Sequence, residues 1–149
     1  MRFWIGSQGS GLGSSTPAVI RRFNDRLDLA FSKTECGEVD GVIVMFYLSS
    51  NFYDGMRPWR RTVRREHTVR DILGRKQEYF HRFVDVSVQV SDGEFLSRTQ
   101  EEQYSFVGTC VASLLDHVFG RLNAGDREAA RSLVLAVRDC PYEERAGVL

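Results

Sequence analysis

Apolar residues recur three or four positions apart in three stretches of the chain, which is the spacing of one buried helix face. These stretches are residues 15–33, 99–125 and 127–139. Gly125 suits the end of the second helix, and Asp126 can cap the start of the third. The predicted buried faces are Val19, Ile20, Phe23, Leu27, Ala30 and Phe31 in the first helix, Val107, Cys110, Val111, Leu114, Leu115, Val118 and Leu122 in the second, and Ala130, Leu133, Val134 and Val137 in the third.

Four other stretches have the composition or the two-residue alternation of β-strands. Residues 2–6 form a short apolar run, and residues 37–50 contain GVIVMFYL, which predicts a strand buried on both faces. Residues 57–70, RPWRRTVRREHTVR, show no apolar helix stripe. We expect an edge or hairpin strand there, because charged residues at a sheet edge discourage aggregation. In residues 81–91 valines alternate with polar residues, and those expected to face the core are Val84, Val86, Val88 and Val90.

The order of these elements is β-α-β-β-β-α-α, which predicts an α+β fold. We expect a small, mostly antiparallel sheet of about four strands with three helices packed on it. The chain has 149 residues, of which 42% are hydrophobic and 27% charged, as in an ordinary soluble domain. No repeat or linker interrupts the chain, so residues 1–149 are expected to form a single globular domain.

No segment predicts a membrane span or a secretory signal. The longest apolar run, GVIVMFYL, is much shorter than the roughly 20 residues that cross a bilayer. The start of the chain, MRFWIGSQGS, lacks the apolar region of a signal peptide, so we expect a cytoplasmic protein. The cysteines show no metal-ligand spacing, and we expect reduced thiols and neither a metal nor a cofactor. The three cysteines are Cys36, Cys110 and Cys140.

A glycine-rich segment, GSQGSGLGSS at residues 6–15, stands between a predicted strand and a predicted helix, where backbone N–H groups can bind phosphate. The segment lacks the lysine of the pattern GxxxxGK[ST] and the glycine spacing of GxGxxG. We therefore interpret the segment as a flexible connector, with nucleotide binding as the alternative.

Residues with catalytic chemistry do not form a recognisable motif. The chain has no GxSxG nucleophile elbow, and no cysteine stands in an activating context. His67 and His81, assisted by Lys76 or an arginine, would serve as an acid–base pair for RNA cleavage if both entered one cleft. Nothing in their spacing requires this, so a nuclease or hydrolase is the weaker alternative.

Charge is distributed unevenly along a chain whose net charge is zero. Residues 57–82 hold eight Arg and one Lys against three acidic residues, and residues 83–149 hold six Arg against eleven acidic residues. The basic segment has three interpretations: a solvated surface, a protein-docking surface, or a nucleic-acid site in which Trp59 or Tyr79 stacks on a base. Nucleic-acid-binding domains are typically basic overall, so a small nucleic-acid-associated protein stays an alternative.

The residue types in and before this segment favour a protein partner. Arg, Trp and Tyr dominate the energetics of protein interfaces. We expect the aromatic residues to anchor the partner and the arginines to pair with its carboxylates. The predicted partner-binding residues are Tyr53, Trp59, Arg60, Arg61, Arg64 and Arg65.

Three consecutive segments carry a resemblance to a known family. They are the strand RPWRRTVRREHTV, the valine strand FVDVSVQVS and the acid-started helix TQEEQYSFVGTCVASLLDHVFGRL, within residues 57–122. This layout resembles the immunity proteins of bacterial polymorphic toxin systems. The resemblance implies a non-enzymatic inhibitor that covers the active site or substrate groove of a cognate toxin, and it carries over no individual functional residue.

This chain departs from many nuclease inhibitors of that kind, which are strongly acidic, because its net charge is zero. The inhibited toxin therefore need not be a basic nuclease. If the toxin is basic, an acidic second surface would bind it instead, formed by Glu101, Glu102, Glu143 and Glu144.

Overall fold

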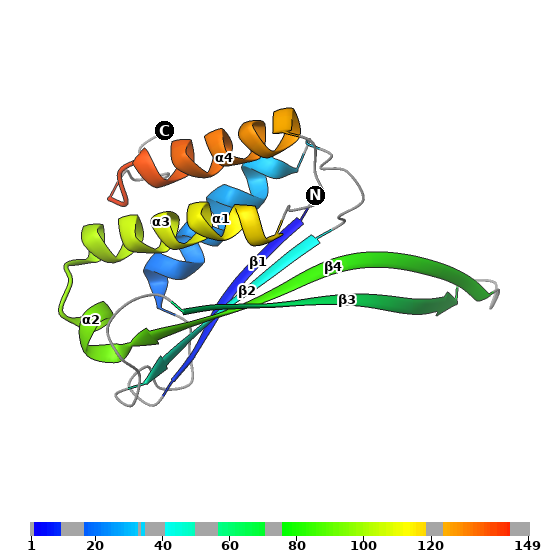
Figure 1. Ribbon diagram of the computed structural model, residues 1–149, viewed down its shortest axis with the longest axis horizontal. Helices are drawn as coiled ribbons and strands as arrows, with labels where there is room; N and C mark the ends of the chain where they lie inside the picture. Colours follow the sequence, from blue (N-terminus) through cyan, green and yellow to red (C-terminus); the bar gives the residue numbers. More distant parts are fainter. Residues whose placement is uncertain are drawn as a thin grey trace.

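The computed structural model has an α+β layout in which helices pack on one face of a sheet (Figure 1). It describes residues 2–9, 17–32, 34, 41–49, 57–70, 76–118 and 124–143, and for residues 57–70 and 76–85 it describes the backbone path and the strand pairing. The elements are β1 (Arg2–Gly9), α1 (Ala18–Phe31), β2 (Gly41–Ser49), β3 (Arg57–Arg70), β4 (Lys76–Ser91), α2 (Asp92–Leu96), α3 (Gln100–Val118) and α4 (Ala124–Asp139).

The sheet has the strand order β1-β2-β4-β3, and β1, β2 and β4 run parallel to one another. The 14-residue helix α1 returns the chain to the end of the sheet at which β1 began, and this crossover makes β1 and β2 parallel. β3 then runs back along the sheet and pairs antiparallel with β4. β4 therefore has the direction of β2 and lies directly beside it.

The prediction of a mostly antiparallel sheet with three helices was wrong. The strands that carry the core are parallel, and the described residues form four helices. The alternation of apolar and polar residues does not encode the direction of a neighbouring strand, which depends on the connection between the strands. The missed helix, α2, has five residues, too few to show an apolar stripe. Its N-cap is Ser91, whose Oγ accepts a hydrogen bond from Glu94 N at 3.4 Å.

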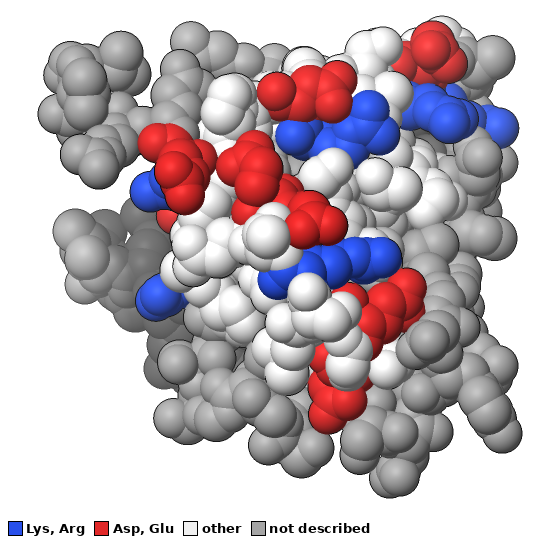
Figure 2. All heavy atoms as spheres, turned by 90° about the vertical axis from the view of Figure 1, so that its left-hand side faces the viewer, with Lys and Arg blue, Asp and Glu red and all other residues white. Residues whose placement is uncertain are grey.

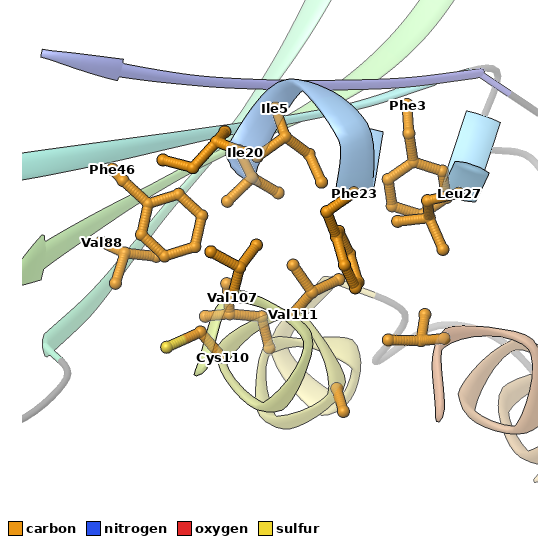
Figure 3. Close-up of a cluster of buried hydrophobic side chains, with 14 of the residues drawn as sticks. Phe3, Ile5, Ile20, Phe23, Leu27, Phe46, Val88, Val107, Cys110 and Val111 are labelled. Atoms are coloured by element: carbon orange, nitrogen blue, oxygen red, sulfur yellow. The ribbon is translucent and has the colours of Figure 1, made fainter. Parts of the chain in front are cut away.

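The hydrophobic core lies between the sheet and the helices. Figure 3 shows side chains of the strands meeting those of α1 and α3, with the ring of Phe23 among them. The Phe23 ring lies 5.4 Å from the ring of Tyr104. Of the predicted helix faces, Ala30 and Leu133 are half-buried. The members confirmed as buried are Val19, Ile20, Phe23, Leu27, Phe31, Val107, Cys110, Val111, Leu114, Leu115, Ala130, Val134 and Val137.

Three predicted boundaries were wrong. α4 begins at Ala124, so Gly125 lies inside this helix and does not end α3. Asp126 lies in the first turn of α4, where a carboxylate still interacts favourably with the helix dipole, and is not its cap. β1 continues to Gly9, so the first part of the glycine-rich segment is strand; its remainder, residues 10–15, lies outside the described residues.

β3 and β4 continue beyond the other strands as a two-stranded ribbon (Figure 1). β2 pairs with residues 83–91 of β4, whereas residues 76–82 pair with residues 64–70 of β3 and with no other described strand. We call residues 64–70 and 76–82 the ribbon. The antiparallel pairing of β3 at the edge of the sheet confirms the hairpin strand predicted for residues 57–70.

The described helices include none that is both long enough and apolar enough to cross a bilayer. The longest of them, α3, has 19 residues.

Candidate macromolecular interface

One face of the parallel sheet is left without a helix layer by α1, α3 and α4, which all lie on the other face (Figure 1). On this open face Ile43, Met45 and Tyr47 of β2 are half-buried, and Trp4 of β1 is 40% exposed. The prediction that β2 is buried on both faces was therefore wrong. Parallel sheets are normally covered on both faces, so the open face is the candidate docking surface.

Strand pairing extends the open face onto β3. Residues that lie directly opposite each other on paired strands belong to the same face of the sheet. Trp59 is paired with Ser87 and Arg61 with Asp85, whereas Val86 between these two partners is buried under the helices. Trp59 and Arg61 therefore belong to the open face.

The predicted partner-binding residues divide between the two sides of β3. Arg65 follows the two residues above on the open side, farther along the strand. Arg60 is paired with the buried Val86 and belongs to the helix-covered side, which Arg64 shares. Tyr53 lies outside the described residues. The five described members of the predicted set thus lie on one strand but not on one face.

The two edges of the sheet differ in the contacts that the structure describes for them. At β1, Phe3 N donates to Asp28 Oδ1 at 2.9 Å, and Ile5 N donates to Asn24 Oδ1 at 2.8 Å. These α1 side chains accept hydrogen bonds from the backbone N–H groups with which an added strand would have to pair. Sequence reasoning missed both residues, whose signal is a pair of polar residues four positions apart beside a buried helix stripe. At the opposite edge β3 is paired with β4 and with no other described strand.

Strand pairing also relates the two histidines of the ribbon. His67 is paired with Tyr79, and His81 is paired with Arg65. The histidines therefore belong to the same side as diagonal neighbours, which in antiparallel pairs lie about 7–8 Å apart. Their sequence spacing did not predict this proximity, which the hairpin supplies. The described part of the chain contains no group of three or more His, Cys, Asp or Glu side chains that could hold a metal ion.

An acidic surface lies at the end of the molecule where α3 begins and α4 ends, and arginines stand between its acidic side chains (Figure 2). Tyr142 N donates to Glu101 Oε1 at 3.2 Å. This hydrogen bond brings Glu101 close to the exposed Glu143, so two members of the predicted acidic surface lie together. Glu144 lies outside the described residues.

The remaining member, Glu102, belongs to a capping box at the start of α3. Glu102 N donates to Thr99 Oγ1, and Thr99 N donates to Glu102 Oε1, each at 3.2 Å. The hydrogen bonds from Thr99 hold the pKa of the Glu102 carboxyl below its ordinary value. The Glu102 carboxylate therefore stays ionised on an exposed surface and accepts the hydrogen bond of Thr99 N, while the Thr99 hydroxyl accepts that of Glu102 N.

An open hollow of about 400 Å³ lies between α1 and the segment that follows α4. Arg22 Nη1 donates to Tyr142 O, and Arg26 Nη1 donates to Pro141 O and to Tyr104 Oη at 3.0 Å each. Burial raises the pKa of the Tyr104 phenol, against the opposing effect of Arg26. These contacts hold the C-terminal segment against α1, so we assign both arginines to packing. The hollow is lined by Ala18, Arg21, Arg22, Asp25, Arg26 and Tyr142.

Cys110 and Cys140 form no disulfide within the described part of the chain, in agreement with the predicted reduced thiols, and Cys36 lies outside the described residues. Cys110 is 3% exposed, and burial raises the pKa of its thiol to about 12. At neutral pH this thiol is protonated and packs as a small hydrophobic group without nucleophilic character.

The chain matches no protein-family model, no curated protein and no solved structure.

Proposed function

We propose that this chain is a non-enzymatic binding protein of the immunity type, which inhibits a cognate toxin by occluding it in a tight protein–protein complex. The observation that carries the proposal is the one-sided cover of a parallel sheet. The open face keeps Trp4 40% exposed beside the half-buried Ile43, Met45 and Tyr47. Aromatic residues contribute most to binding free energy where a partner excludes water from them. A parallel sheet normally has a covering layer on both faces, which a partner would supply here.

The residues of β3 beside this face fit the border of a protein interface. Trp59 and Arg61 belong to the open face by strand pairing, and Arg65 follows on the same side. The planar guanidinium of arginine binds a carboxylate through two parallel hydrogen bonds. An apolar centre with arginine beside it has the composition of the core and rim of a protein–protein interface.

The immunity type is suggested by the succession of β3, β4 and α3, which occupy the three segments that resemble immunity proteins. An inhibitor of this type acts stoichiometrically and changes no covalent bond. Because the proposed contact surface offers arginines, the complementary surface of the toxin carries carboxylates.

The substitution Trp4→Glu tests this function, with the product of a neighbouring gene as the partner. It places a charge on the open face, at the exposed aromatic residue of β1, so we expect the affinity to fall about 30-fold or more, as at an interface hot spot. The matched control is Leu29→Glu, at a 76% exposed residue of α1 on the helix side. Calorimetric titration gives both affinities, and rescue of cells that express the partner gives the functional result.

Two results would contradict the proposal. The first is the absence of a 1:1 complex with the neighbouring gene product. The second is an equal affinity of Trp4→Glu and Leu29→Glu for that partner, because the open face would then lie outside the interface. Circular dichroism spectra of both variants verify that the fold is retained.

A further inference from the structure

We propose that the outer edge of β3 takes up an acidic, extended segment of the partner protein as an additional strand of the sheet. This inference rests on the proposed function for the premise that the partner is a protein. It adds the conformation of the bound segment and its sequence pattern.

β3 is the edge of the sheet at which a strand can be added. At β1, the N–H groups of Phe3 and Ile5 already donate to Asp28 and Asn24 of α1, and an incoming strand would break these hydrogen bonds. β3 is 14 residues long and, among the described strands, is paired with β4 alone. The side of β3 that faces away from β4 pairs with no described strand, and an added strand would use the backbone donors and acceptors of that side.

The positions of the arginines distinguish an added strand from a partner that docks on one face. Arg61 and Arg65 belong to the open side of β3, and Arg60 and Arg64 belong to the helix-covered side. A partner surface that docks on the open face would contact only Arg61 and Arg65. An added strand alternates its own residues between the two sides of the sheet and would meet both pairs.

The spacing of these arginines defines the complementary sequence. Two neighbouring arginines stand at 60–61 and two more at 64–65, with two other residues between them. A strand paired with β3 therefore matches them with two adjacent carboxylates, two other residues and two more adjacent carboxylates, the pattern E-E-x-x-E-E or its aspartate equivalent. A second copy of β3 does not fit, because the strand carries six arginines and one glutamate, and like charges placed opposite each other are destabilising.

The experiment uses the full chain and a labelled peptide, acetyl-TVEETVEETV-amide, with binding measured by fluorescence anisotropy. A second peptide has the same sequence with N-methyl groups on its four central residues, which removes backbone donors and leaves the charge unchanged. We expect the first peptide to bind, and the N-methylated peptide to bind at least about tenfold more weakly because it loses backbone hydrogen bonds.

Two double variants test whether both sides of β3 take part. We expect Arg60→Ser with Arg64→Ser, and Arg61→Ser with Arg65→Ser, each to weaken peptide binding by about tenfold. The charge-matched control replaces two exposed arginines on helices, Arg21→Ser with Arg131→Ser, and should bind as the unmodified chain does. Where a double variant does not fold, the single variants Arg60→Ser and Arg61→Ser replace it.

The outcomes separate this inference from the proposed function. Equal binding of the two peptides overturns strand addition. Sensitivity confined to Arg61 and Arg65 also overturns it, and it leaves a face-docked protein partner in place. Tighter binding of single-stranded DNA than of the acidic peptide overturns both, because it makes nucleic acid the partner of β3.

Discussion

Gly108 allows α3 and α4 to pack closely, because a side chain has no room at this position. A Cβ atom on Gly108 would lie 2.5 Å from Arg138 Cγ, 2.6 Å from Arg138 Cβ and 3.0 Å from Phe23 Cε2. The two Arg138 atoms lie next to the α4 backbone and cannot swing away as the end of the side chain can. The substitution of any larger residue therefore pushes α4 away from α3 or displaces the buried ring of Phe23.

We expect Gly108→Ala to lower the free energy of unfolding by about 1–3 kcal/mol, the cost of overpacking a well-filled interior. Gly93→Ala is the matched control, since a Cβ atom at that position meets Ser91 Oγ at an ordinary 3.7 Å, and we expect a change within about 0.5 kcal/mol. Urea unfolding curves of both variants measure the two changes. If Gly108→Ala were as stable as the wild type, α3 and α4 would have to lie farther apart than in this structure.

The buried thiol of Cys110 makes stability depend on pH in the alkaline range. Its pKa is raised by burial from 9.0 to about 12, so between these values the unfolded chain releases a proton that the folded chain keeps. The stabilisation is complete below pH 9 and is lost as pH rises toward 12, by up to about 1.4 kcal/mol per pH unit.

We therefore expect the stability advantage of the wild type over Cys110→Ala to shrink between pH 9 and pH 11. Val111→Ala, which truncates an adjacent buried residue without a titrating group, should keep a constant deficit over the same range. Urea unfolding at several pH values measures both differences. A constant deficit in Cys110→Ala would show that the thiol ionises equally easily in the folded chain.

At the residue scale the sequence predicts burial better than it predicts contacts. The helix faces that contain Phe23, Val107 and Cys110 follow from their spacing alone, because a helix has a fixed period. The role of Gly108 does not follow, because it depends on which helix lies opposite. Asn24 and Asp28 were missed for the same reason: a polar side chain reveals its partner only when the neighbouring strand is placed.

Among the elements, α1 both covers the sheet and closes one of its edges. Its apolar stripe packs on β1, and Asn24 and Asp28 beside that stripe accept hydrogen bonds from the backbone of the edge strand. A strand edge that is satisfied in this way cannot recruit another strand without breaking existing bonds. The same helix thus directs any added strand to β3.

We expect Asp28→Ala to lower the free energy of unfolding by about 1–3 kcal/mol, because Phe3 N would lose a charged acceptor. Asp28→Asn keeps an oxygen acceptor at the same position and should retain at least half of that contribution. Thermal and urea unfolding measure the difference between the two variants. Equal stability of Asp28→Ala and the wild type would contradict the role assigned to this hydrogen bond.

The element order was largely predictable, and the directions of the strands were not. Residues 57–70 were expected at an edge because of their arginines, and β3 lies there. The parallel arrangement of β1 and β2 follows from the helical crossover between them, a constraint that the alternation of side chains does not contain. α2 escaped prediction because a helix of five residues has no periodicity to detect.

At the scale of the whole molecule, the site is defined by pairing between strands. The sequence predicts that Trp59 and the arginines of residues 60–65 mark an interaction surface, since their types are those of interfaces. It does not predict that these residues divide between the two sides of β3, because the register with β4 decides this. The contribution of Trp4 to the open face was missed for a related reason, as it depends on the helices covering only that face of β1 which carries Phe3 and Ile5 (Figure 1).

The position of β2 between β1 and β4 also bears on how the chain is made. As the polypeptide leaves the ribosome, β2 finds β1 already synthesised, but its second neighbour is complete only about 40 residues later, at Ser91. At roughly 5–20 residues per second, this interval lasts about 2–8 seconds. During that time the apolar strand GVIVMFYLS lacks one of its two neighbours, so non-native contacts of this segment are most favourable before β4 has been synthesised.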